Sequence, residues 1–138
     1  MSAVFQKQVH PSAPWSRELF AEAVTVSGPG TTLYLSGIGP EALGDQPGDI
    51  QHRGDVYAQT KLAYDKARQV LAKHGASLAD VVKITAYVVD ARTLAEYHRA
   101  RREAFQGVPP PAHTLLVISA LAWPGMLVEV DLTAVTGV

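Results

Sequence analysis

The last quarter of the chain, from Pro109 to Val135, restricts the fold most strongly, because it holds two β-type runs with a sharp break between them. Ala112 to Ile118 and Met126 to Val135 are rich in β-branched and apolar residues, which is typical of strands. Trp123-Pro124-Gly125 lies between them, and a Pro-Gly pair interrupts regular pairing. The pattern predicts two strands joined by a turn.

The second of these runs alternates apolar and polar residues. Side chains of a strand point to opposite faces in turn, so one face of this strand is predicted to be core and the other polar. Glu129 belongs to the polar set and has apolar neighbours on both sides along the chain. The predicted core face consists of Met126, Val128, Val130, Leu132 and Ala134.

The N-terminal half predicts three further strands, over residues 5–9, 21–27 and 31–36. Gly28-Pro29-Gly30 separates the last two, and this composition is typical of a hairpin. A helical period follows over residues 51–74, with Gly75 in the place of a C-terminal cap.

The C-terminal half continues with a strand over residues 81–89, whose Val82, Ile84, Ala86 and Val88 share one face. A second helix then begins at a predicted capping box of Thr93 and Glu96. The order of elements predicts one α+β domain over residues 1–138, with a mixed sheet covered on one face by two helices.

Composition excludes several classes of protein. The chain has no cysteine, which excludes disulfides, thiolate metal sites and a cysteine nucleophile. No apolar run resembles an export signal or a membrane span, so we expect a soluble cytoplasmic protein without membrane contact. The 12 Lys and Arg against 13 Asp and Glu give no overall field that would attract nucleic acid.

Four stretches together resemble the YjgF-like Rid family of reactive intermediate deaminases. They are Asp80 to Asp90, Leu35 to Gly37, the pair Gln59-Thr60, and the closing PAHTLLVISALAWPGMLVEVDLTAV. The resemblance implies a chorismate-mutase-like fold and a homotrimer with a central barrel and clefts between subunits. It also implies hydrolysis of a small imine or enamine to a ketone and ammonia, without metal or organic cofactor.

Four positions depart from what the resemblance implies. His113 stands where typical members carry an Arg that binds a substrate carboxylate, and Trp15 stands where Tyr is usual. Leu115 replaces a frequent Cys, and His98 a frequent Asn. Guanidinium is always charged and forks onto a carboxylate, whereas imidazole is only partly charged near neutrality. The set indicates a subgroup with an altered substrate or altered chemistry.

Imine hydrolysis needs a positioned water and a group that takes its proton, and a desolvated carboxylate can do this. Glu129 is the candidate base, and His113 is the candidate hydrogen-bond donor, acid or base. Glycine lets a ligand approach the backbone closely, which favours the Ser36-Gly37-Ile38 segment as a binding loop. The predicted substrate-binding residues are Trp15, Ser36, Gly37, Ile38, His98 and Trp123.

Other interpretations stay open. Glu129 could be a solvated or salt-bridged residue, and His113 and His98 could be structural or surface residues. A metal set of His98, His113 and Glu129 is less favoured, because the residues lie on separate elements. Both predicted helices carry basic residues, between Lys61 and Arg68 in the first and between Arg99 and Arg102 in the second. A solvated helical face explains these residues better than an RNA site does. A non-catalytic ligand-binding or regulatory trimer is the alternative function.

Overall fold

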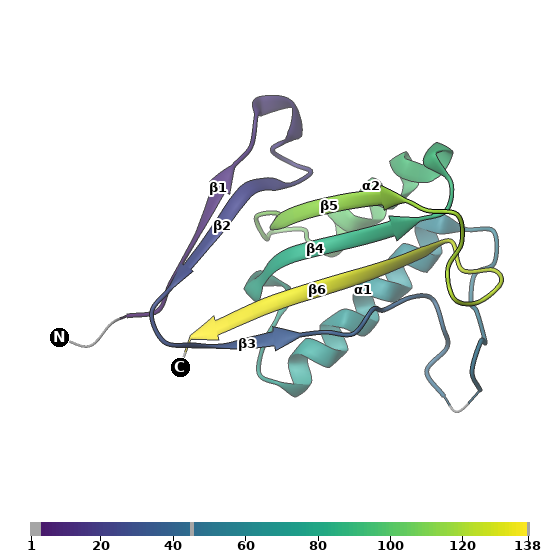
Figure 1. Cartoon of the computed structure of the whole chain (residues 1–138), viewed down its shortest axis with the longest axis horizontal. Helices are drawn as coiled ribbons and strands as arrows, with labels where there is room; N and C mark the ends of the chain where they lie inside the picture. Colours follow the sequence, from purple (N-terminus) through teal and green to yellow (C-terminus); the bar gives the residue numbers. More distant parts are fainter. Residues whose placement is uncertain (1–3, 45, 138) are drawn as a thin grey trace.

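The computed structural model describes residues 4–44 and 46–137, and Figure 1 shows a mixed α+β fold with two helices on one face of a sheet. Within these residues, two α-helices and six strands follow one another in the order β-β-β-α-β-α-β-β. The elements are β1 (Gln6–Pro11), β2 (Ala21–Ser27), β3 (Gly30–Tyr34), α1 (Val56–Lys73), β4 (Val81–Val88), α2 (Leu94–Ala104), β5 (Ala112–Val117) and β6 (Val128–Gly137).

The sheet has the strand order β1-β2-β5-β4-β6-β3, so the predicted hairpin between residues 21–27 and 31–36 is wrong. β2 pairs antiparallel with β1, and β3 pairs antiparallel with β6 at the opposite edge. Both predicted segments form strands, but the composition of the segment between them does not determine which strand each one pairs with. The long, buried β6 takes β3, and Leu33 then lies opposite Ala134 of the core.

The two C-terminal strands are confirmed, but they do not pair with each other. β4 lies between them, parallel to β5 and antiparallel to β6. The predicted turn is therefore part of a longer connection that crosses the end of β4. On its other side β5 has a single ladder partner, Ala112 opposite Ala21 of β2. The β1–β2 ribbon consequently splays away from the other four strands in Figure 1, and most of the β5 edge is left unpaired.

Helix α1 begins at Val56 rather than near Gln51, because Asp55 caps it. The Asp55 carboxylate accepts a hydrogen bond from the backbone N–H of Ala58 at 2.9 Å. At the other end Gly75 has φ of 72°, and the Ala76 N–H donates to the Leu71 carbonyl at 2.9 Å, which confirms the glycine cap.

The predicted capping box of α2 is wrong. Thr93 makes no side-chain cap on the helix, and its hydroxyl instead donates to the Asp90 carbonyl at 2.7 Å. Asp90 opens the preceding short turn by accepting from the Arg92 N–H at 2.9 Å. The Asp therefore takes the capping role a few residues earlier than the Thr-Glu pattern predicts.

The core lies between the helices and one face of the sheet. The predicted alternation of β6 is confirmed: Val128, Val130, Leu132 and Ala134 are at most 1% exposed, and Glu129 lies on the other face. In β4 a register shift between Val81 and Lys83 buries Val81 instead of the predicted Val82. Figure 1 shows no helix over the opposite face of the sheet. Within the described residues, no helix has the length and apolar character that a membrane span requires.

Candidate active site

Glu129 lies beside the segment that joins β3 to the long loop before α1. Ile38 and Val130 exchange two backbone hydrogen bonds, each of 2.8 Å, which fixes this segment against β6. A Cβ atom built on Gly37 would lie 3.0 Å from Cδ of Glu129. Only a residue without a side chain allows so close an approach of backbone to carboxylate. The structure therefore places Gly37 against Glu129, whereas Ser36 and Ile38 line a pocket of about 600 Å3 together with Val70 and His74.

The environment of Glu129 favours its protonated form. Burial raises the pKa of the Glu129 carboxyl, and the nearby carboxylates of Glu41 and Asp131 raise it further. Glu41 is held by Lys66, whose ammonium group donates to the carbonyls of Gly39 and Glu41, each at 2.8 Å. No salt bridge joins Glu129 to a cation among the residues that the structure describes. The result is a half-buried carboxylate that is free to accept a proton.

His113 belongs to a second cluster, between β5 and α2. Its Nε2 lies 2.7 Å from the hydroxyl of Tyr97, and that hydroxyl lies 2.5 Å from the hydroxyl of Tyr64 in α1. Both tyrosines are fully buried. Burial lowers the pKa of His113 to about 3, and the positive charge of Arg101 contributes to this. His113 is therefore neutral at physiological pH.

His98 and Trp15 border the same cluster. The rings of His98 and His113 lie 6.3 Å apart, and Nδ1 of His98 is buried without a hydrogen-bond partner among the described residues. Trp15 and His113 line an open pocket of about 410 Å3 where the β1–β2 ribbon leaves the sheet. Trp15 is 78% exposed and packs edge-on against Phe20. The structure thus assembles Trp15, His98 and His113 as a second group.

The two groups lie on opposite faces of the sheet. Residues directly opposite each other in neighbouring strands share a face. His113 is opposite Ile84, which faces the helices, whereas Glu129 is opposite Tyr87, which faces away from them. One chain therefore does not bring Glu129 and His113 into one cleft, and it does not assemble the metal set with His98 either.

Trp123 joins neither group. It lies in the connection between β5 and β6, where its ring packs against Gly48 of the long loop. With Val89 and Met126 it lines a separate pocket of about 370 Å3, and neither Glu129 nor His113 lines that pocket. This position agrees with a turn residue that packs on a neighbouring loop.

Sequence reasoning missed three residues that shape these groups. Tyr97 and Tyr64 hold His113, and Glu41 raises the pKa of Glu129. A signal exists for Tyr97, which lies on the apolar side of its helix next to His98, because a buried phenol needs a hydrogen-bond partner. Glu41 gives no such signal, since the polar loop that carries it has no period.

Comparison with known proteins identifies the family. The model of the family described as Endoribonuclease L-PSP, which is the YjgF/Rid family, matches residues 8–136. The chain belongs to the YjgF/Rid family. A RutC family protein of Pyrococcus abyssi is 30% identical to this Rid protein over 129 residues, covering 94% of the chain and 91% of the relative.

Solved structures of Rid proteins share the fold. A protein of the conserved Rid family from Yersinia pestis has a TM-score of 0.79 and 28% identity, with 93% of this chain and 97% of the other covered. A YjgF family member from Mycobacterium tuberculosis has a TM-score of 0.65 and 25% identity, with 95% and 100% covered. Membership in the Rid family supports, in general terms, a small-molecule deaminase or a related function.

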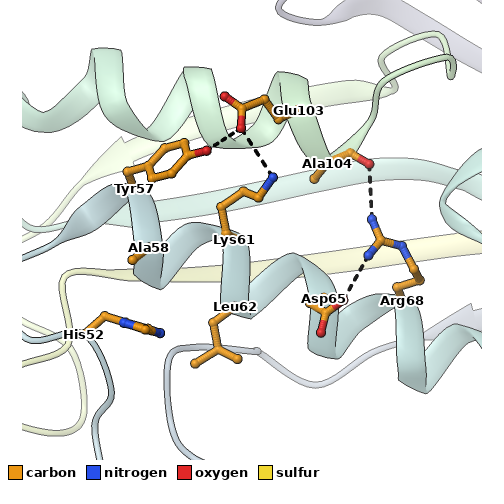
Figure 2. Close-up of a pocket in the computed structure, with 9 residues that line it drawn as sticks. All are labelled: His52, Tyr57, Ala58, Lys61, Leu62, Asp65, Arg68, Glu103 and Ala104. Carbon is orange, nitrogen blue, oxygen red and sulfur yellow. Dashed lines mark hydrogen bonds and ion pairs between the residues drawn. The ribbon is translucent and has the colours of Figure 1, made fainter.

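The family name Endoribonuclease L-PSP refers to cleavage of RNA, so the basic surface of the two helices has to be considered as an RNA site. Residues of α1 and α2 line a groove with a volume of about 470 Å3, and Figure 2 shows their side chains. There Lys61 contacts Glu103 at 3.4 Å and Arg68 contacts Asp65 at 3.0 Å. Arg101, predicted to lie on the solvated face, is only 1% exposed. The acidic partners of Lys61 and Arg68 reduce the positive charge of this groove, which favours a solvated helical face over an RNA site.

Proposed function

We propose that this Rid protein hydrolyses the C=N bond of a small imine, or of the imine tautomer of an enamine metabolite, with Glu129 as the base that activates water. The Glu129 carboxylate beside Gly37 carries the proposal. It is half-buried, unpaired by any cation among the described residues, and lies against Gly37, whose lack of a side chain allows this close approach. Membership in the Rid family supports the same class of reaction.

The proposed reaction needs no external oxidant or reductant. Glu129 takes a proton from water, and the water oxygen attacks the carbon of the C=N bond. That proton then passes to the nitrogen, the hydroxyl proton of the addition product follows it, and breaking of the C–N bond releases a ketone and ammonia. A tautomerase of the same site would use Glu129 to move a proton between carbon and nitrogen. The raised pKa of Glu129 suits both reactions, because a stronger base takes a proton more readily.

The proposed cleft lies between two subunits of a homotrimer. Glu129 and His113 lie on opposite faces of one chain, so a shared cleft requires Glu129 of one copy and His113 of another. The unpaired edge of β5 supports such an assembly, because exposed strand edges tend to be covered. Leu116 and Val117 on β5 are 43% and 50% exposed in the isolated chain. Ser36, Gly37 and Ile38 would hold the substrate on one side, and Trp15, His98 and His113 on the other.

Ammonia release from imino acids tests the proposed chemistry. Imino acids are generated in place by an amino-acid oxidase, and ammonia and ketone are measured with and without the protein. We expect Glu129→Gln to abolish the acceleration. Glu96→Gln is the matched control, because Glu96 is exposed on α2 and undergoes the same change of residue and charge when replaced. Full activity of Glu129→Gln would refute the role of Glu129. Ligand binding by the wild type without any turnover would favour the non-catalytic trimer instead.

Mixing two inactive variants tests the intersubunit cleft. Glu129→Gln and His113→Ala each damage one side of the proposed site. When the two variants are unfolded and refolded together, mixed trimers contain some clefts with both native residues. We expect partial recovery of turnover in the refolded mixture and none when the separately refolded variants are combined and assayed at once. A sedimentation experiment that finds only monomers would contradict the trimer.

A further inference from the structure

The hydrogen-bond chain from Tyr64 through Tyr97 to His113 has a direction. Each phenol carries one proton, and each is fully buried. Tyr97 is the single hydrogen-bond partner of the Tyr64 hydroxyl among the described residues. Tyr64 must therefore donate to Tyr97, since the opposite direction would leave its buried O–H without an acceptor, which is costly. Tyr97 then has its own proton left for Nε2 of His113, at 2.7 Å.

This direction fixes the tautomer of His113. A neutral imidazole has one nitrogen that donates and one that accepts. Because Nε2 accepts from Tyr97, the proton of His113 is on Nδ1. Nδ1 has no hydrogen-bond partner among the described residues, and it is not among the buried atoms that lack one. The ring is thus bonded to protein at Nε2 and has Nδ1 available, and His113 is one of the residues that line the pocket beside Trp15.

We infer that Tyr64 and Tyr97 hold His113 as a neutral Nδ1–H donor. The site therefore takes a substrate that has an uncharged acceptor at this position, such as an amide or ester carbonyl, instead of a free carboxylate. The part of the inference that concerns substrate rests on the proposed function. One fixed N–H recognises a carbonyl oxygen well, but it lacks the charge and the second donor that favour a carboxylate.

The cations nearest to His113 do not supply the positive charge that an Arg at this position would carry. Arg101 is 1% exposed, and its guanidinium donates to the Glu18 carbonyl at 2.7 Å. Lys83 lines the pocket, but it donates to the Thr114 hydroxyl at 2.7 Å and leaves β4 on the face opposite to His113. Both positive charges, together with the neighbouring His98, disfavour a proton on His113. They thus help to keep the imidazole neutral.

Nitrogen NMR tests the tautomer directly. Long-range proton–nitrogen spectra of histidine-labelled protein distinguish the two neutral tautomers, and His113→Gln identifies the signal among the 5 histidines. We expect the Nδ1–H form at pH 7 in the wild type. Tyr97→Phe should lose this preference. Tyr64→Phe, which removes an equally buried hydroxyl, should keep it, because Tyr97 then has only His113 as acceptor. An Nε2–H form or an imidazolium in the wild type overturns the inference.

The same signal tests the substrate class with two compounds: pyruvamide carries an amide where pyruvate carries a carboxylate. We expect pyruvamide to shift the His113 signal with about tenfold tighter binding than pyruvate, a difference typical of a single polar contact. Lys83→Met should keep the preference. Equal or tighter binding of pyruvate, or no shift with either compound, overturns the substrate class. If tautomer and preference hold but no imine is hydrolysed, the proposed reaction fails and this inference stands.

Discussion

Gln59 joins three segments around the turn that leads to Glu129. It is fully buried in α1, and its amide nitrogen donates to the carbonyls of Gly125, Gln51 and His52 at 2.9, 3.1 and 3.3 Å. Its amide oxygen accepts from the backbone N–H of Leu127 at 2.8 Å. One side chain therefore forms hydrogen bonds both with the backbone just before α1 and with the backbone just before β6.

Gln59→Leu keeps the approximate volume and removes every one of these hydrogen bonds. The largest cost is the Leu127 N–H, because a buried donor left without a partner costs about 1–3 kcal/mol. The carbonyls of Gln51 and His52 lie in a partly exposed segment, so water can replace their lost partner. Adding about 1 kcal/mol for the Gly125 bond, we expect a loss of roughly 2–4 kcal/mol in the free energy of unfolding.

Urea unfolding followed by circular dichroism measures this loss, at one fixed protein concentration because assembly of subunits also affects stability. Gln69→Leu is the matched control, since Gln69 is exposed on the same helix and its side chain hydrogen-bonds, among the described residues, only to Asp65, at 3.2 Å. We expect that control to stay within about 0.5 kcal/mol of wild type. If Gln59→Leu changed stability no more than Gln69→Leu does, Gln59 would not hold the turn as described.

Three further predictions follow from single contacts. Gly37→Ala would place a Cβ 3.0 Å from Cδ of Glu129 and should lower turnover by roughly 10–100-fold, whereas Gly44→Ala, with open space around it, should not. His113 has its ordinary pKa of 6.5 in the unfolded chain and a pKa of about 3 in the folded chain, so the folded state loses stability as the pH falls between these values. His113→Gln does not have this loss, so the stability difference between wild type and His113→Gln should shrink. Urea unfolding at several pH values measures that difference. Asp55→Ala removes the cap on α1 and should cost about 1 kcal/mol in the same assay, while Asp55→Asn should cost less.

The sequence predicted those parts of the fold that depend on a local period. The alternation in β6 placed Glu129 on the face away from the core, and the helical period over residues 51–74 placed α1. Pairing of strands is a property of the whole sheet, so the composition around Pro29 predicted a hairpin that does not form. Similarly, the Thr93–Glu96 spacing predicted a capping box, and it did not indicate that Asp90 caps the short turn before α2.

The candidate site was predicted as a set of residues but not as an arrangement. Glu129 and Gly37 meet because β6 and the segment after β3 are neighbours, which a pattern of residue types does not determine. Likewise, Tyr97 is buried on the inner side of α2, but only the packing of the fold brings its hydroxyl to His113. The division of the site between two faces of the sheet follows from strand register alone.

The setting of His113 also explains why an Arg at this position would not simply restore a carboxylate anchor. A guanidinium there would stay charged next to Arg101, which already loses hydration in the core and has a lowered pKa for that reason. It would also leave the Tyr97 hydroxyl without the acceptor that Nε2 supplies, because guanidinium has no acceptor. A neutral ring at position 113 and the buried pair Tyr97 and Tyr64 are therefore matched to one another. Adoption of a charged anchor would require the helical side of the site to change as well.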